Sequence, residues 1–151
     1  MGSVLSIIMR LFLGGLFILA GVLKLSDPQP FAEAIKAFKI LPEHVFAFAA
    51  YGLPWIEIFA GGLLIIGLWT RAAALLITVL LAAFTVGIVS VILRGIDTKC
   101  SCFGELEWPC AGDVGQCQII RNSVLMLAGV IILAVGPGRF AAEGPRRVPV
   151  D

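Results

Sequence analysis

Four long apolar segments spread over most of the chain are the feature that most limits how this sequence can fold. They lie at about residues 4–25, 53–69, 72–93 and 119–135. A bilayer core about 30 Å thick needs roughly 20 apolar residues in a helix, and these segments are of about that length. With 60% hydrophobic and 14% charged residues, the chain is too apolar for an ordinary soluble domain. The sequence therefore predicts an all-α membrane protein, a single membrane domain of residues 1–151 folded as a four-transmembrane-helix bundle.

The segments between and after the spans have distinct characters. We expect the first span to be retained rather than cleaved as a signal peptide, because Arg10 lies inside the apolar stretch. Residues 27–30 read Asp-Pro-Gln-Pro, which favours a helix start, and Phe31, Ile35 and Phe38 then recur at helical spacing between charged residues. This pattern predicts an interfacial helix after the first span. A cysteine-rich loop, 94–118, separates the third and fourth spans, and a polar tail, 139–151, ends the chain.

Orientation in the membrane has to be argued from cysteine chemistry. Four spans place both termini on one side and the cysteine-rich loop on the other. Lysine and arginine are almost evenly divided between the two sides, so the positive-inside rule does not decide. Disulfides belong to oxidising compartments. We therefore expect a multi-pass protein of the cell inner (plasma) membrane with cytoplasmic termini and an extracytoplasmic loop.

Ionisable residues inside a membrane are costly, and Arg10, Lys24 and Glu57 lie within the predicted spans. Helical geometry places Arg10 and Lys24 on one face of the first span, together with glycines and Phe17, and this face should point into the bundle. Lys24 and Glu57 should lie at similar depth near the loop. One interpretation is an ion pair that locks two helices. A functional interpretation adds to it: a cationic Lys24 or Arg94 near the loop would favour thiolate formation. Arg10 is expected to snorkel to the opposite surface.

The loop holds every cysteine in the chain, Cys100, Cys102, Cys110 and Cys117. The first two are separated by one residue, so a disulfide between them closes a small, strained ring that suits exchange better than scaffolding. Cys110 and Cys117 would form a second pair, either structural or shuttling electrons. Two purely structural disulfides are one alternative. A four-thiolate metal site is another, but the spacing is not a familiar ligand pattern, and we predict no metal.

Other function classes are set aside by what the sequence contains. A net charge of +1 without a basic cluster provides no footprint for nucleic acid. His44 is the only histidine, which argues against a histidine-rich metal site or haem site. Signatures for flavin and nucleotide cofactors are also missing.

Several motifs resemble one family. They are Arg10-Leu-Phe-Leu-Gly14-Gly-Leu-Phe17-Ile-Leu-Ala-Gly21-Val-Leu-Lys24-Leu, Phe31, Leu53-Pro54-Trp-Ile-Glu57, Gly61-Gly62-Leu-Leu, Arg94-Gly95, Cys100-Ser-Cys102-Phe103-Gly104 and Arg121-Asn122. Over about residues 10–135 the chain resembles the MauE/DoxX family of redox-associated membrane proteins. The C-x-C-F-G sequence is the specific part of the match. The segment from Glu105 to Gln116, with Cys110 and Cys117, goes beyond the basic family pattern.

The resemblance implies a role in thiol and disulfide metabolism, since MauE is associated with maturation of the disulfide-rich methylamine dehydrogenase. By motif position, it assigns the catalytic pair to Cys100 and Cys102, with supporting charges at Lys24 and Glu57. Arg94 and Arg121, which bound the loop, are further supporting charges.

We therefore expect a membrane thiol-disulfide redox protein or maturation factor, an oxidoreductase that exchanges disulfides with an extracytoplasmic client protein. Quinone is the electron acceptor implied by the family, with a site near Phe17, Glu57 and Phe84. The alternative is a non-catalytic accessory subunit of a larger membrane complex, with structural disulfides in its outer loop.

Overall fold

The structure is a computed structural model that describes residues 2–38, 42–95 and 115–136. Within these ranges, the side chains of residues 2, 3, 37, 38 and 43–47 are not described. The helices are α1 (Gly2–Ser26), α2 (Gln29–Phe38), α3 (Glu43–Ile66), α4 (Thr70–Leu93) and α5 (Gln116–Val135).

Four of these helices are long and apolar enough to cross a membrane. The candidate spans are Val4–Ser26, Phe48–Ile66, Thr70–Leu93 and Gln116–Val135. The described part of the chain contains helices and turns only. The prediction of an all-α protein with four transmembrane helices is therefore confirmed.

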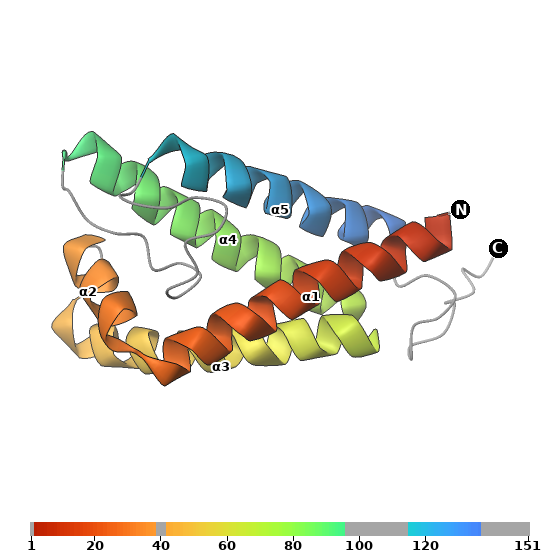
Figure 1. Ribbon diagram of the computed structural model, residues 1–151, viewed down its shortest axis with the longest axis horizontal. Coiled ribbons are helices and arrows are strands. Elements are labelled where there is room, and N and C mark those ends of the chain that lie inside the picture. The colour runs from red at the N-terminus through yellow and green to blue at the C-terminus, as the bar shows by residue number, and fades with distance from the viewer. Residues whose placement is uncertain (1, 39–41, 96–114, 137–151) are drawn as a thin grey trace, which may run out of the picture.

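The helices form two closely packed pairs, α1 with α3 and α4 with α5 (Figure 1). Contacts between α3 and α4 and between α1 and α5 join the pairs into one bundle. The ribbons of the two pairs converge toward the end where the N-terminus lies and diverge toward the end where α2 lies. The end of α1, the end of α4 and the start of α5 thus share the α2 end of the bundle.

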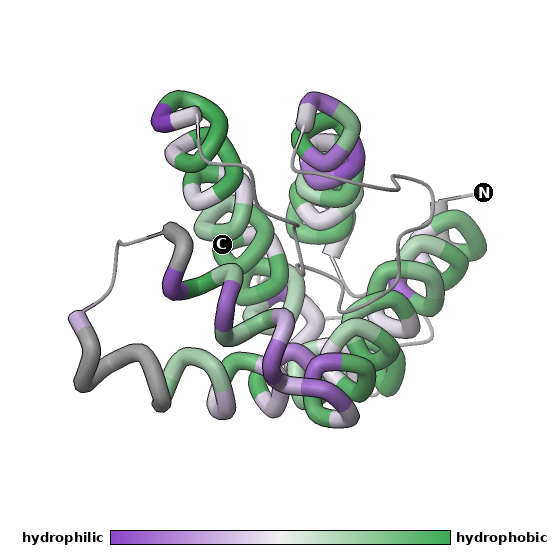
Figure 2. Tube along the Cα trace, turned by 60° about the vertical axis from the view of Figure 1, so that its left-hand side comes forward, coloured by the Kyte–Doolittle hydropathy of each residue, from purple (hydrophilic) through white to green (hydrophobic). Residues whose placement is uncertain are grey.

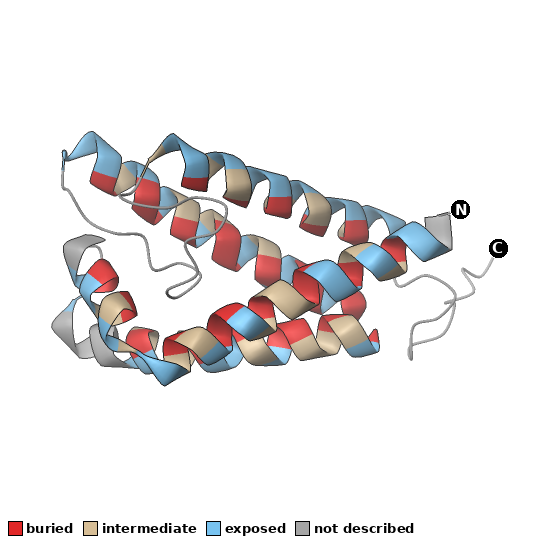
Figure 3. Ribbon diagram, in the orientation of Figure 1, coloured by how far each residue is buried: buried red, intermediate tan, exposed pale blue. Residues whose placement is uncertain are grey.

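The outward faces of the bundle are apolar, as a lipid-exposed surface requires. Figure 2 shows hydrophobic residues along the four long helices and more hydrophilic ones around α2. Buried residues line the faces that the helices turn toward one another (Figure 3). Leu13, Leu64, Ile77, Leu81 and Ile88 are fully buried there. Lipid tails are as apolar as these side chains, so close packing between helices is what stabilises the bundle.

Glycines allow α1 and α3 to approach closely. A Cβ atom on Gly14 would lie 2.7 Å from the Gly61 carbonyl oxygen, and one on Gly61 would lie 2.6 Å from the Gly14 carbonyl oxygen. Nearer the α2 end, a Cβ on Gly21 would lie 2.7 Å from the Pro54 oxygen. Gly62 has open space beside it. Of these two neighbouring glycines, Gly61 therefore makes the close contact with α1.

The second span differs from its expected bounds of 53–69. Helix α3 begins at Glu43, after Pro42, and continues through Pro54, which lies inside the helix. It ends at Ile66 because Gly67 adopts a left-handed conformation with φ 78°. Trp55 therefore lies well within the span rather than at its edge, while exposed Trp69 lies in the turn to α4. Proline is tolerated within a transmembrane helix because neighbouring helices and local adjustments satisfy the freed backbone groups.

Helix α2 has the expected amphipathic character. Phe31, Ala34 and Ile35 are buried against the bundle, whereas Glu33 and Lys36 are exposed. It contacts both α3 and α4. The helix predicted after the first span is thus present, and it brings Phe31 to the diverging end of the bundle.

Candidate functional site

A buried ion pair joins α1 to α3. The Nζ atom of Lys24 donates hydrogen bonds to both carboxylate oxygens of Glu57, at 2.6 Å to Oε1 and 2.8 Å to Oε2. The two side chains are 0% and 1% exposed. Charges removed from water to this degree are tolerated only when they are paired and hydrogen-bonded. The prediction that Lys24 and Glu57 lie at similar depth is confirmed, and the ion pair locks the two helices together.

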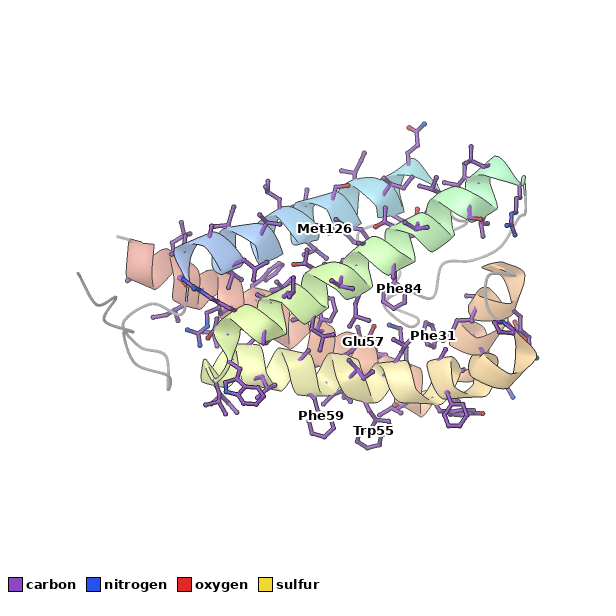
Figure 4. The ribbon with its side chains drawn as sticks, turned by 180° about the vertical axis from the view of Figure 1, so that it is seen from behind. Phe31, Trp55, Glu57, Phe59, Phe84 and Met126 are labelled. Atoms are coloured by element: carbon purple, nitrogen blue, oxygen red, sulfur yellow. The ribbon has the colours of Figure 1, made fainter. Side chains whose placement is uncertain are left out.

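Two phenylalanine rings flank the ammonium group of Lys24. Its Nζ atom lies 4.8 Å from the ring centre of Phe31 on α2 and 5.0 Å from that of Phe84 on α4. The rings meet edge to face, with centres 6.2 Å apart. Figure 4 shows Glu57, Phe31 and Phe84 directed toward one another, while Trp55 and Phe59 point away from the bundle. Cation–π attraction is strongest at desolvated sites, so these rings stabilise the buried charge.

The buried face of α1 positions Lys24. Arg10, Gly14, Phe17, Gly21 and Lys24 are all buried, as the helical spacing predicted. The close approach of Gly21 to the Pro54 oxygen lies one turn from Lys24. This tight crossing brings the ammonium group within hydrogen-bond distance of Glu57, one turn after Pro54 on α3.

Arg10 does not snorkel, contrary to the sequence-based expectation. It is 3% exposed. Its Nε donates to the Leu64 carbonyl oxygen at 2.9 Å, and its Nη2 donates to the Ile65 oxygen at 3.4 Å. The last carbonyls of a helix have no partner within the helix. Arg10 satisfies those at the end of α3, which makes a charged side chain favourable inside the bundle.

The first turns of α5 carry residues that the sequence assigned to the redox loop. Cys117 is exposed, lies next to the first residue of the helix and is disulfide-bonded. Arg121 lies one turn further along and is half-buried. The start of α5 therefore carries both Cys117 and Arg121 at the α2 end of the bundle (Figure 1).

An asparagine inside the bundle was missed by the sequence reasoning. Asn122 is fully buried, and its Nδ2 donates to the Thr85 hydroxyl oxygen on α4 at 3.4 Å. Polar side chains within a transmembrane segment are functional candidates. The position of Asn122 in the fourth apolar segment could therefore have identified it from the sequence. Asn122 had been noted only as part of a family motif.

The structure describes only some of the other residues that the sequence assigned to the site. Arg94 ends α4 as its C-terminal cap and is exposed at the α2 end of the bundle. Cys100, Cys102 and Cys110 lie outside the described residues. The structure therefore brings Lys24, Glu57 and Arg121 to one end of the bundle and places Cys117 and Arg94 at that same end.

The charged residues at the α2 end of the bundle determine which chemistry this site could support. The carboxylate of Glu57 and the ammonium of Lys24 neutralise each other, so the ion pair offers little net charge to a neighbouring group. Arg94 and Arg121 carry positive charge at the end of the bundle where Cys117 lies. Positive charge near a sulfur favours its thiolate form, which is the reactive form in disulfide exchange. Arg94 and Arg121 are therefore candidates for that role, whereas the Lys24–Glu57 pair is suited to a structural one.

Comparisons with known proteins identify the family to which the chain belongs. The sequence profile of the family described as methylamine utilisation protein MauE matches residues 2–135. The methylamine utilization protein MauE of Paracoccus denitrificans is 29% identical over 136 residues, which cover 89% of this chain and 69% of that protein. No solved structure matches the chain significantly. The family match spans all four transmembrane helices and the ion pair: this chain is a multi-pass membrane protein that belongs to the MauE family.

Proposed function

We propose that this protein is a membrane thiol-disulfide redox protein that oxidises an extracytoplasmic client. The single observation that carries the proposal is the disulfide of Cys117, which is exposed in the first turn of α5. It lies at the end of a bundle that also presents Arg94 and Arg121. The relative from Paracoccus denitrificans is named for methylamine utilisation, and the family resemblance of the sequence implies a maturation role.

The proposed reaction is disulfide exchange followed by reoxidation. A client thiolate attacks the Cys100–Cys102 disulfide and forms a mixed disulfide, which the second client thiolate resolves. The client leaves with a new disulfide, and two thiols remain on this chain. These two thiols give two electrons and two protons to a quinone, which becomes a quinol as the disulfide re-forms. Cys110 and Cys117 serve as a second pair, either bracing the loop or relaying the electrons.

The charges near the cysteines should assist this reaction. A cation close to a cysteine stabilises the thiolate as it attacks or leaves. Arg94 is exposed at the end of α4, and Arg121 lies one turn from Cys117. Because Lys24 is held by Glu57, its contribution would be structural.

The membrane arrangement completes the proposal. We place the cysteine-rich loop on the extracytoplasmic side and the termini in the cytoplasm, because disulfides persist in oxidising compartments. The client is then a disulfide-rich protein outside the cytoplasm. A quinone would enter from the lipid and bind between the helix pairs, near Phe17, Glu57 and Phe84, which are all buried.

A second candidate is an accessory subunit of a larger membrane complex. The observation that favours it is the outward face of α3, where Trp55 is 53% exposed, Phe59 is 67% exposed and Gly62 has open space beside it. Large aromatic residues beside a glycine suit packing against another transmembrane helix. In that case the disulfides would only shape the outer loop.

Thiol trapping in native membranes separates the two candidates. The wild-type protein and single Cys→Ser variants of the four cysteines are alkylated before and after mild reduction, with and without added quinone, and metal content is measured in parallel. The redox proposal predicts that Cys100 and Cys102 are readily reduced and that quinone restores their disulfide. Cysteines that all resist mild reductant, or that hold stoichiometric metal, would favour the accessory subunit.

A further inference from the structure

The side-chain amide of Asn122 has a fixed orientation in the bundle. The hydroxyl of Thr85 donates its proton to the Leu81 carbonyl oxygen at 2.7 Å, so its oxygen can only accept a hydrogen bond from Asn122. The group facing Thr85 must therefore be the Nδ2 amine, which lies 3.4 Å away. The amide oxygen Oδ1 consequently points to other surroundings.

That oxygen is a buried acceptor without a donor in the described part of the chain. Asn122 is 0% exposed, and no described residue donates a hydrogen bond to Oδ1. Buried polar atoms in native proteins nearly always have a partner, which can be a water or a bound molecule. Inside a membrane bundle an apolar residue of similar size would avoid the cost altogether. The amide oxygen is therefore suited to a donor that the described residues do not provide.

The position of Asn122 connects the two groups of the candidate site. It lies five residues after Cys117, which corresponds to about 7.5 Å along the helix axis. Its partner Thr85 is adjacent to Phe84, whose ring flanks the ammonium of Lys24. A molecule bound at Asn122 would thus lie deeper in the bundle than Cys117 and at about the depth of Phe84.

We propose that Asn122 Oδ1 accepts a hydrogen bond from a hydroxyl group of a hydroquinone bound in the bundle, an inference that rests on the proposed redox function. The carbonyl oxygens of a quinone only accept hydrogen bonds, so Oδ1 cannot bind them directly. The hydroxyl groups formed after uptake of two electrons and two protons are donors. Asn122 therefore holds the reduced product more tightly than the oxidised substrate and favours electron transfer from the dithiol to the quinone.

Binding to the full-length protein in lipid nanodiscs tests this assignment. The probes are a decyl-substituted benzoquinone and its quinol, measured anaerobically by equilibrium dialysis. The variant is Asn122→Leu, and the matched control is Ser123→Ala, whose exposed hydroxyl donates to the Ile119 carbonyl on the lipid-facing side of α5. Asn122→Leu should weaken quinol binding by about tenfold, the value of one buried hydrogen bond, and leave quinone binding within about twofold. Ser123→Ala should change neither affinity.

A second variant keeps the test decisive if Asn122→Leu does not fold. Thr85→Val removes the acceptor for Nδ2, so the amide can rotate and present either group to the ligand. The preference for quinol over quinone should then fall, even though Asn122 is still present. If Asn122→Leu does not fold, the preference measured with Thr85→Val decides the matter.

The outcomes separate this inference from the proposed function. Quinol binding that is the same in wild type, Asn122→Leu and Thr85→Val overturns the assignment of Asn122, while quinone-dependent reoxidation of the wild-type cysteines would still support the redox proposal. Quinol binding that depends on Asn122, in a protein whose cysteines quinone does not reoxidise, supports the binding site and refutes the redox proposal. A wild-type protein that binds neither probe refutes the inference.

Discussion

Removing one partner of the Lys24–Glu57 ion pair should destabilise the bundle far more than removing both. Each side chain is almost completely buried, and the two share hydrogen bonds of 2.6 and 2.8 Å. Breaking a buried pair leaves an uncompensated charge and typically costs about 3–5 kcal/mol. Glu57→Leu should lie near the lower value, because the unpaired Lys24 keeps the attraction of the two phenylalanine rings. Lys24→Met should lie near the upper value, because it also loses the attraction of the two phenylalanine rings.

The double variant Lys24→Met with Glu57→Leu removes both charges and keeps much of the side-chain volume. Replacing a buried ion pair with apolar residues is often close to neutral, so this variant should lose only about 1 kcal/mol. The two single effects together amount to about 8 kcal/mol and should then exceed the effect of the double variant by about 7 kcal/mol. A large coupling energy of this kind would identify the ion pair as a lock between α1 and α3.

Reversible unfolding in mixed micelles with increasing dodecyl sulfate provides the measurement, followed by fluorescence of the three tryptophans. Glu33→Gln, at an exposed position on α2, is the matched control and should stay within about 0.5 kcal/mol of wild type. Hydrogen bonds between transmembrane helices average about 0.6 kcal/mol in comparable double-variant cycles. A coupling energy of about 0.6 kcal/mol or less would refute the argument, because the buried ion pair would then be no stronger than an ordinary hydrogen bond between transmembrane helices.

Three further changes test the packing around the site in the same unfolding assay. Gly61→Val should lower the free energy of unfolding by about 2–4 kcal/mol, because its Cβ would meet the Gly14 backbone. Gly62→Ala, at a position with open space, should leave it nearly unchanged. Equal effects of the two variants would contradict the observed crossing of α1 and α3. Arg10→Met should lower the free energy of unfolding by about 1–3 kcal/mol, since it leaves carbonyls at the end of α3 without donors. An unchanged midpoint of the unfolding transition would show that these hydrogen bonds do not stabilise the protein. Phe84→Leu should cost about 1–2 kcal/mol through loss of the cation–π contact, and this loss should vanish in a background that carries Lys24→Met.

Much of the bundle follows from patterns that the sequence displays directly. Apolar length identified the four spans, and helical periodicity placed Arg10 and Lys24 on the buried face of α1. The depth of Lys24 and Glu57 followed from alternating span directions. These features depend on local geometry and on the membrane thickness, both of which a single sequence reveals.

Other features depend on contacts between helices, which local patterns do not encode. Arg10 was expected to reach the membrane surface, but the end of α3 offers it buried carbonyl oxygens. Phe31 and Phe84 flank Lys24 only because α2 and α4 meet at the end of the bundle. The second span was expected at about residues 53–69, whereas α3 runs from Glu43 to Ile66 with Pro54 inside it.

The central claim is that two thiols on this chain reduce one quinone as their disulfide re-forms. Its most direct test is the stoichiometry of that reaction in purified protein, reduced with dithiothreitol, freed of reductant and mixed anaerobically with the decyl-substituted benzoquinone. Quinol is measured by absorbance, and protein thiols are counted in the same samples. The account predicts one quinol formed for every two thiols lost, with less quinol formed when Cys100 and Cys102 are replaced by serine. Thiols that stay constant in the presence of quinone, or quinol formed equally by the serine variant, would contradict it.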